Sequence, residues 1–344
     1  MKTGNVNLLF SNIKPGQFEL TEFPSGRITD SNELTDPILI AENLTKTYGR
    51  VRAVSDLNLQ VRRGEVFALI GPNGAGKTTT IKMILGLTRP DHGLVRLLGE
   101  DPWDNPEVHS SLGVVFERSH FPGHEAAADY LVRTCRIFGL PASRANEVLD
   151  IVGLSNDKRK QIGSLSAGML QKFAIGHAIV HGPRLIVADE MTSNLDPGAR
   201  SMVLNLVGHL RNEQGTTFIL SSHILQELGL VCDSVAIISD GKILVSGRLD
   251  QLYEKYATRV TRIATDKAEL LLSELRKLPN VTKIESLNRE LFIYAKSAGT
   301  TELYEEILTA AKKVDARILS ITSDSRSLQQ LYDSVMTSQG GDST

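Results

Sequence analysis

A glycine-rich segment holds the first residues that could do chemistry: Gly71-Pro72-Asn73-Gly74-Ala75-Gly76-Lys77-Thr78 fits the pattern G-x-x-x-x-G-K-[ST]. The segment follows the apolar run 66–70 and opens an amphipathic stretch, so it joins a predicted strand to a predicted helix. In this context backbone N–H groups surround a phosphate, Lys77 reaches the β- and γ-phosphate oxygens, and Thr78 ligates Mg²⁺. We therefore expect these residues, with Thr79, to bind a nucleoside triphosphate. The alternative is a chance glycine-rich turn.

Two carboxylates, Asp189 and Glu190, follow a second apolar run at 185–188. The metal side of a triphosphate site needs a carboxylate at the end of a buried strand, so Asp189 is predicted to hold Mg²⁺ through water. Glu190 would then lie beside the γ-phosphate and could polarise the attacking water as a general base. An isolated Asp-Glu pair is most often surface charge, but the preceding apolar strand favours the catalytic interpretation.

The composition of the 344 residues is that of a soluble globular protein of about two domains, with 41% hydrophobic and 23% charged residues. Lys and Arg number 38 against 40 Asp and Glu, and a net charge of −2 argues against nucleic-acid binding by bulk electrostatics. Cys135 and Cys232 are too few for a disulfide framework, and no apolar run approaches the roughly 20 residues of a membrane helix. We expect a cytoplasmic protein with two buried thiols.

The pattern along the chain predicts an α/β fold in several parts. Residues 1–36 show no sustained period and are interpreted as a loosely ordered extension. From Pro37 short β-rich runs predict an antiparallel layer, helical spacing marks a subdomain at about 120–180, and later apolar strands indicate a parallel sheet. Beyond residue 252 the order strand, helix, strand, strand, helix, strand is similar to a ferredoxin-like split βαβ unit.

The segment Leu165-Ser166-Ala167-Gly168-Met169 completes a resemblance to the ATP-binding subunits of ABC transporters, whose signature motif is usually written LSGGQ. The resemblance covers about residues 37–250. It implies a P-loop NTPase of the ABC type, with a nucleotide-binding domain at 37–251 that contains the antiparallel β layer and the helical subdomain. A small C-terminal α+β domain, 252–344, would follow. The resemblance also implies hydrolysis of ATP with Mg²⁺ as cofactor.

The signature segment is expected to bind the ATP of a partner subunit. A serine hydroxyl and the N–H groups of a helix start suit an anion, so Ser166 and Gly168 could contact a γ-phosphate. The family implies that this phosphate belongs to the partner, so that two subunits enclose two ATP molecules head to tail. The simpler alternative is that Ser166 only caps a helix.

Three further residues take roles from the resemblance. Tyr48 matches the aromatic that stacks on adenine, His223 the switch histidine that contacts the γ-phosphate, and Asp196 the D-loop residue that couples the two sites. Simpler alternatives stay open. Tyr48 could pack on the surface, His223 could be structural, and Asp196 could cap the helix that begins at Pro197.

The sequence departs from the family pattern at several positions. Glu117 stands where the Q-loop glutamine is usual; a carboxylate can still bind the metal, but it adds negative charge near the γ-phosphate. Met191 replaces a usual proline and Met169 a usual glutamine, and neither change removes a reacting group. His177, in place of a common arginine, forms an i, i+4 pair with His181 that could hold zinc, although no third ligand is evident.

The resemblance therefore implies an ATPase subunit that forms a homodimer, or a heterodimer with another ATP-binding subunit, beneath separate transmembrane permease chains. The protein would be peripheral on the cytoplasmic face of the membrane, and the C-terminal domain resembles that of drug, lipid or ion exporters. The main alternative is a soluble ABC-type ATPase acting on ribosomes or DNA, but no double cassette or coiled-coil insertion is visible, and no nucleic-acid partner is expected. A cassette that binds ATP without cleaving it would need the loss of Glu190 or Lys77.

Overall fold

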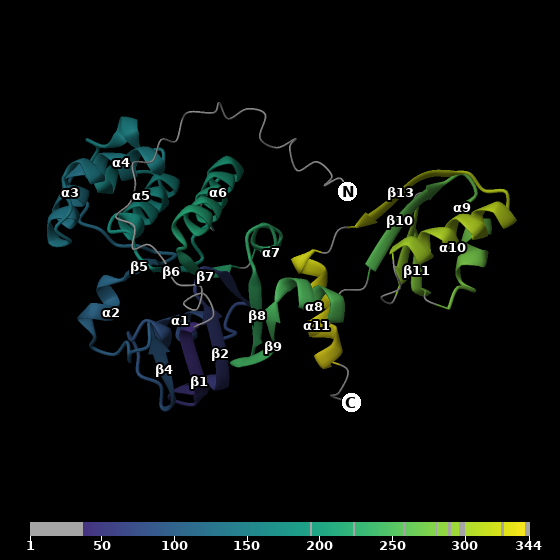
Figure 1. Ribbon diagram of the computed structural model, residues 1–344, viewed down its shortest axis with the longest axis horizontal. Helices are drawn as coiled ribbons and strands as arrows, with labels where there is room; N and C mark the ends of the chain where they lie inside the picture. The colour runs from purple at the N-terminus through teal and green to yellow at the C-terminus, as the bar shows by residue number, and fades with distance from the viewer. Residues whose placement is uncertain are drawn as a thin grey trace. The chain divides into compact units, whose positions relative to one another are not determined.

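A computed structural model describes residues 37–192, 195–222, 224–256, 259–279, 281–287, 290–295, 300–324 and 327–340 (Figure 1). The extension predicted at 1–36 lies outside the described residues. The chain divides into two compact units, one built from residues up to Phe67 with Gly76–Ser222, the other from Ala68–Ala75 with the chain after Ser222. No helix among the described residues has both the length and the apolar character needed to cross a membrane.

The antiparallel layer is a three-stranded sheet of order β2-β1-β4, formed by β1 (Pro37–Tyr48), β2 (Val51–Arg62) and β4 (His92–Leu97). The sheet confirms the predicted layer, but its first two strands are each continuous over 12 residues, where the pattern indicated shorter runs. Asn43 and Asp56 interrupt the apolar alternation and adopt left-handed φ values of 51° and 49°. The register shifts around Asn43 and Asp56 while the strands stay paired, which is how a β-bulge absorbs extra residues.

The central sheet has six strands in the order β5-β6-β7-β3-β8-β9. In the first unit β5 (Leu112–Val115), β6 (Leu185–Asp189) and β7 (Thr217–Ser222) run parallel, and all residues of β6 and β7 are buried. The short strand β3 (Val66–Ile70) is buried throughout as well. In the second unit β8 (Ser234–Ser239) and β9 (Lys242–Arg248) form an antiparallel hairpin. Continuous apolar strands with both faces covered are typical of parallel sheets.

Three helices form the predicted helical subdomain: α3 (Ala127–Ile137), α4 (Ser143–Ile151) and α5 (Ala167–Ile179). Single 3₁₀ turns at 155–157 and 162–164 connect α4 to α5. The remaining helices of the first unit are α1 (Lys77–Ile84), α2 (Pro106–Ser110) and α6 (Pro197–Gln214).

An aromatic cluster holds the helical subdomain to the segment that follows β5. Phe121 lies edge-on to Phe173 of α5, with ring centroids 5.0 Å apart, and to Tyr130 of α3 at 5.4 Å. His177 of α5 joins the cluster 5.5 Å from Phe121 and 5.6 Å from Tyr130. Burial among these rings, and to a lesser degree the neighbouring His181, lowers the pKa of His177 to about 4.

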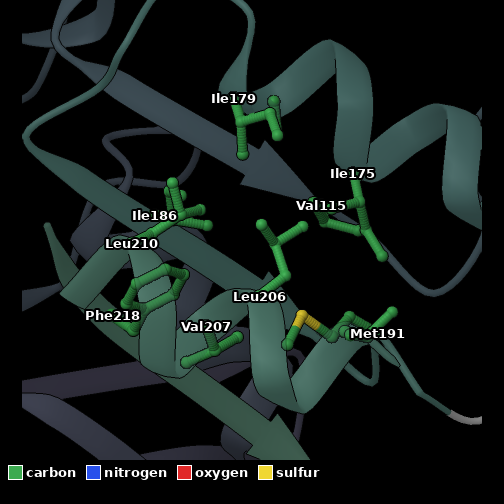
Figure 2. Close-up of a pocket in the computed structure, with 11 residues that line it drawn as sticks. Val115, Ile175, Ile179, Ile186, Met191, Leu206, Val207, Leu210 and Phe218 are labelled. Carbon is green, nitrogen blue, oxygen red and sulfur yellow. The ribbon is translucent and has the colours of Figure 1, made fainter. Parts of the chain in front are cut away.

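A small apolar cavity of about 10 Å³ lies between α5, α6 and the parallel strands (Figure 2). Figure 2 shows side chains of Ile175 and Ile179 facing those of Leu206, Val207 and Leu210 across this space. A cavity of this size with apolar walls offers water no hydrogen-bond partner, so we expect it to be dry.

The C-terminal part is a second α+β layer. Its strands are β10 (Arg259–Thr265), β11 (Val281–Leu287), β12 (Glu290–Ala295) and β13 (Ile318–Asp324), all antiparallel in the order β11-β12-β10-β13. We call them, with α9 (Ala268–Leu275) and α10 (Thr300–Lys313), the tail sheet. This strand order supports the predicted split βαβ unit. The flanking helices are α8 (Leu249–Tyr256), which crosses the predicted boundary at 251/252, and α11 (Leu328–Gly340), which the pattern did not predict.

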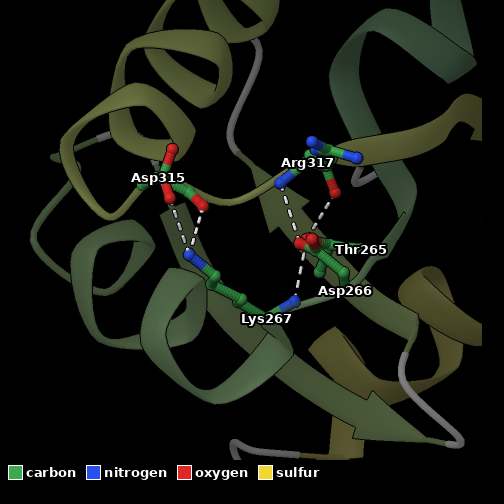
Figure 3. Close-up of polar contacts among 5 residues, drawn as sticks. All are labelled: Thr265, Asp266, Lys267, Asp315 and Arg317. Atoms are coloured by element: carbon green, nitrogen blue, oxygen red, sulfur yellow. Dashed lines mark hydrogen bonds and ion pairs between the residues drawn. The ribbon is translucent and has the colours of Figure 1, made fainter.

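The end of β10 and the start of β13 are joined by polar contacts (Figure 3). The backbone N–H of Arg317 donates to Asp266 Oδ1 at 2.8 Å, and the Thr265 hydroxyl donates to the Arg317 carbonyl at 2.9 Å. Lys267 Nζ donates to the carbonyl of Asp315 and lies 3.0 Å from Asp315 Oδ2, which closes the left-handed turn at Asp315. These contacts fix one edge of the tail sheet.

We predict opposite effects of two glycine-to-alanine changes in the first unit. At Gly113 in β5, a Cβ would lie 2.4 Å from the Ala178 carbonyl oxygen, so Gly113→Ala should destabilise the fold by about 1–3 kcal/mol. Gly208 in α6 has nothing within 4 Å of a Cβ, so Gly208→Ala should stabilise by about 0.5–1 kcal/mol. Urea unfolding midpoints measure both. Equal midpoints for the two variants would contradict the packing described at β5.

We also predict a pH-dependent loss of stability from His177. Its pKa in the fold is lowered to about 4 from 6.5, so as the pH falls below 6.5 the unfolded chain takes up a proton that the folded chain excludes. Folding stability should fall between pH 6.5 and 4, by about 3 kcal/mol at the lower end. The unfolding free energy of His177→Phe should show a shallower slope, the remainder coming from His181, whose pKa burial also lowers. That of the exposed control His92→Gln should retain the full slope. Parallel curves for the wild type and His177→Phe would contradict the assignment.

Candidate functional site

The glycine-rich segment forms the turn between β3 and α1. A Cβ at Gly71 would lie 2.2 Å from the Ile238 carbonyl oxygen of β8, so only glycine fits there. The N–H of Ala75 donates to the Pro72 carbonyl at 3.2 Å and closes the turn. Gly76, at φ 104°, is the left-handed N-cap of α1. The segment therefore presents the N-terminus of α1, where backbone N–H groups and the helix dipole favour a phosphate.

The first two residues of α1 differ in exposure. Lys77 is 6% exposed, whereas Thr78 is exposed and its hydroxyl donates to Asp189 Oδ2 at 2.9 Å. The structure thus brings together Thr78 and Asp189, two of the three residues predicted to hold the metal, the third being Glu117. A hydroxyl and a carboxylate are the hard oxygen ligands that Mg²⁺ prefers, so this pair fits that ion.

Asp189 is the last residue of β6 and is 6% exposed. Its second carboxylate oxygen, Oδ1, accepts a hydrogen bond from the hydroxyl of Ser221. The parallel register of β6 and β7 places Asp189 opposite Ser221, so the contact follows from strand pairing. A buried carboxylate without such donors would be costly, and here hydroxyl groups from two elements supply them.

Glu190 follows directly and has a left-handed backbone with φ 55°. Its N–H donates to both the Oγ and the carbonyl oxygen of Ser221, each at 3.1 Å. A left-handed glutamate is uncommon and costs about 1–3 kcal/mol, so it persists only where neighbours hold it. Ser221 therefore fixes the Asp189 carboxylate and the backbone of Glu190 together.

The signature segment precedes and begins α5. Ser166 is the exposed N-cap of this helix, and its Oγ accepts from the Met169 N–H at 3.3 Å. In the single chain Ser166 therefore caps α5, as the simpler alternative states. Its binding of a partner's phosphate stays a prediction. Further along α5 the buried Gln171 donates from Nε2 to the Met191 carbonyl at 3.0 Å. This contact ties the signature helix to the segment that follows Asp189 and Glu190.

Asp196 is the exposed N-cap of α6 and accepts from the Ala199 N–H at 2.9 Å, which lowers the pKa of its carboxyl group. Pro197 occupies the first helical position, as the capping alternative requires. The D-loop role of Asp196 stays a prediction. Ser193, Asn194 and the predicted switch residue His223 lie outside the described residues.

Tyr48 and Glu117 are both exposed. Tyr48 ends β1 at 48% exposure, beside a turn at Gly49, and Lys46 Nζ lies 5.7 Å from its ring centroid. An exposed ring of this kind is available for stacking on a base. Glu117 lies just beyond β5. No contact of either side chain with Thr78 or Asp189 is established, so their roles stay predictions.

The zinc alternative for the histidine pair gains no support. His177 packs edge-on to Phe121, while His181 stacks on Phe138 at 4.3 Å and its Nε2 lies 3.0 Å from the Leu112 carbonyl oxygen. Over the described part of the chain, no group of three or more His, Cys, Asp or Glu could hold a metal ion. Both rings therefore serve packing and backbone hydrogen bonding.

Ser221 and Gln171 are the residues of this site to which the motifs assigned no role. A serine at the end of a strand carries no spacing signal, because its contact with Asp189 depends on which strand lies next to β6. The available signal was its place in Leu220-Ser221-Ser222, at the end of an apolar run. Gln171 could have been noticed as an amide among the apolar residues of α5.

Comparison with known proteins gives a consistent result. Residues 54–193 match the family model described as ABC transporter. The chain is 37% identical over 220 residues to the bacitracin transport ATP-binding protein BcrA of Bacillus licheniformis, covering 63% of this chain and 72% of that protein. It is 30% identical over 305 residues to the linearmycin resistance ATP-binding protein LnrL of Bacillus subtilis, covering 86% and 97%. A dimeric ATP-binding cassette in a post-hydrolysis state bound to ADP and Pi superposes with a TM-score of 0.57 at 25% identity, covering 61% of this chain and 98% of that one.

We predict that Ser221→Ala lowers catalytic turnover. The change removes the hydroxyl that bonds Asp189 Oδ1 and Glu190 N–H, and the loss of a hydrogen bond to a buried charge should reduce kcat for ATP about 10-fold or more. A steady-state phosphate-release assay measures this. Ser201→Ala in α6, whose hydroxyl bonds only the Pro197 carbonyl of its own helix, is the control. Unchanged kcat in Ser221→Ala would show that this hydroxyl does not organise the site.

Proposed function

The chain belongs to the family of ABC transporter ATP-binding proteins, and from this premise we propose that it hydrolyses ATP to drive export through a separate membrane-spanning chain. The hydrogen-bonded group of Thr78, Asp189, Ser221 and the Glu190 backbone carries the proposal. It joins the start of α1 to the ends of two parallel strands, where a triphosphate on the glycine-rich turn would place its terminal phosphate. The motifs predict a nucleoside triphosphate, and the family implies that this nucleotide is ATP.

The glycine-rich turn binds the phosphates. Backbone N–H groups of 73–76 and of the α1 N-terminus donate to the phosphate oxygens, and Lys77 neutralises the β- and γ-phosphate oxygens. Thr78 would ligate Mg²⁺ directly, Asp189 through water, and Glu117 from the end of β5. The ion, when bound, neutralises charge on the phosphate oxygens. Tyr48, exposed at the end of β1, stacks on the adenine.

Glu190 acts as the general base in hydrolysis. Its carboxylate takes a proton from the attacking water as the water oxygen bonds to the γ-phosphorus and the bond to the β-phosphate oxygen breaks. The left-handed backbone and its two hydrogen bonds to Ser221 support a fixed position for this residue. His223 contacts the γ-phosphate and senses its release.

Two subunits close on two ATP molecules. Ser166 and Gly168, exposed or half-exposed at the start of α5, reach the γ-phosphate held by the glycine-rich turn of the other subunit, and Asp196 couples the two sites. The partner is a second copy or another ATP-binding subunit. The dimeric form of the related cassette supports this arrangement.

The membrane part of the transporter is proposed to be a permease made of separate chains, with this subunit peripheral on the cytoplasmic face. The names of the two relatives, bacitracin transport and linearmycin resistance, support export of a drug-like compound. We assign 37–251 to the ATPase and 252–344 to an accessory domain. The 305 residues aligned with the linearmycin resistance protein exceed the length of the cassette, so part of the accessory domain is shared with that relative. No described feature favours action on ribosomes or DNA.

We predict that Glu190→Gln binds ATP but hydrolyses it about 100-fold more slowly or worse, because an amide cannot take the proton from water. With ATP bound and not cleaved, the variant should accumulate as a dimer, whereas the wild type should not. Phosphate release and light scattering with and without Mg-ATP measure the two properties. Lys77→Ala is the matched control, since it should lose ATP binding and stay monomeric. Wild-type turnover in Glu190→Gln would remove Glu190 from the chemistry.

A further inference from the structure

Gln171 is a buried amide in a helix that is otherwise apolar on its buried side. Its side chain is 4% exposed, and every other buried residue of α5 is apolar or glycine. Burying an amide costs free energy unless its hydrogen bonds are made, and a leucine or methionine would fill the same space without that cost. The bond from Gln171 Nε2 to the Met191 carbonyl oxygen, at 3.0 Å, therefore points to a role besides packing.

The acceptor of this bond lies one residue beyond Glu190, the proposed general base. Glu190 has a left-handed backbone with φ 55°, a conformation that persists only where neighbours hold it. Ser221 of β7 holds the N–H of Glu190, and Gln171 of α5 holds the carbonyl of the next residue, Met191. The strained residue thus lies between two backbone groups that are fixed from different elements.

The helix that provides this contact is itself fixed at several points along its length. Phe173 and His177 pack edge-on to Phe121. At the C-terminal end of α5 the buried Arg144 of α4 donates from Nε to the carbonyl of Val180, the C-cap residue, at 3.2 Å. A hydrogen bond from a helix held in this way can fix the peptide group that it reaches.

Packing alone does not set the orientation of that peptide group. The Met191 side chain is 5% exposed and lines the same small apolar cavity as Ile175 and Ile179 of α5 (Figure 2). Apolar packing is not directional, so it keeps Met191 against the helix but does not determine where its carbonyl points. The hydrogen bond from Gln171 is directional and selects one orientation.

We propose that Gln171 is a positioning residue for Glu190: by holding the Met191 carbonyl it keeps the backbone of the general base in its left-handed conformation, and so supports the rate of ATP hydrolysis. The inference rests on the proposed function, which assigns the base to Glu190. It concerns turnover and not nucleotide binding, because the hydrogen bond ends on Met191, outside the glycine-rich turn.

The first test exchanges Gln171 for methionine in the full chain. Gln171→Met keeps the length of the side chain but removes the donor, so kcat for ATP should fall about 3- to 10-fold with KM nearly unchanged. Thr134→Val is the matched control, because Thr134 of α3 is 6% exposed and its hydroxyl donates to the Tyr130 carbonyl of the same helix at 3.1 Å. This variant also loses a bond from a buried side chain to a backbone carbonyl, but its kcat should be unchanged. An equal loss of kcat in both variants, or a change confined to KM, would overturn the proposal.

A double variant tests whether Gln171 acts through Glu190. Ser221→Ala removes the hydroxyl that holds the N–H of the same residue. Once either contact is lost, Glu190 is already able to leave its conformation, so the second loss should cost less than it does alone. The combined loss of kcat in the double variant should therefore be smaller than the product of the two single losses. Losses that simply multiply would mean that Gln171 does not position Glu190.

A third measurement does not depend on activity. The backbone amides of 190–192 should exchange hydrogen faster in Gln171→Met than in the wild type, and at the wild-type rate in Thr134→Val. Unchanged exchange in Gln171→Met would contradict the proposal. If the wild type itself released no phosphate, the proposed function would fail, while the exchange measurement would still decide whether Gln171 holds this segment.

Discussion

The structure depends above all on one buried carboxylate, Asp189, and on the donors that satisfy it. A charge at 6% exposure is stable only if hydrogen bonds replace its water, and here they come from Thr78 at the start of α1 and Ser221 at the end of β7. These hydrogen bonds therefore join the start of α1 to the ends of the parallel strands β6 and β7. Because Ser221 also accepts the N–H of the left-handed Glu190, the same contact sets the direction in which the chain leaves β6.

This constraint extends to the helical subdomain through polar and aromatic contacts. Gln171 of α5 reaches the carbonyl of Met191, so the signature helix is attached two residues beyond Asp189. On its other side α5 packs through Phe173 and His177 on Phe121, a few residues after Glu117. α5 is thus attached near the segment that follows Asp189 and Glu190 and near the segment that contains Glu117. Both segments are predicted to lie beside the γ-phosphate. Since packed contacts have discrete arrangements, a shift at either segment would move the helix as a unit.

Much of the fold could be predicted, and the exceptions have physical reasons. The order strand, helix, strand, strand, helix, strand predicted beyond residue 252 is the order of β10 to β13 with α9 and α10. The first strands were expected as short runs because Asn43 and Asp56 break the alternation, but bulges accommodate them, helped by the Asp56 N–H bonded to the Thr45 hydroxyl. The pattern did not predict α11 because its apolar residues lie in a segment rich in Ser, Asp and Gln. Of the site, fixed motifs reveal Lys77, Thr78, Asp189 and Glu190 directly. The role of Ser221 cannot be predicted from spacing, because its contact with Asp189 depends on which strand lies next to β6. Ser166 and Asp196 are predicted to act on a partner subunit, and in the single chain they only cap helices.

The tail sheet is better understood as inserted between α8 and α11 than as appended to the chain end. An appended domain on one flexible connection moves almost independently, because a single linker transmits little torque or displacement. The tail sheet instead has two connections in the chain, one to α8 and one to α11, and these two helices lie against each other. The outer face of the sheet carries ion pairs, Arg262 with Glu290 and Lys283 with Glu285, which are exposed and contribute little to stability. The sheet is held instead by its inner face, so its outer face can change without loss of the fold while its attachment to the ATPase is preserved.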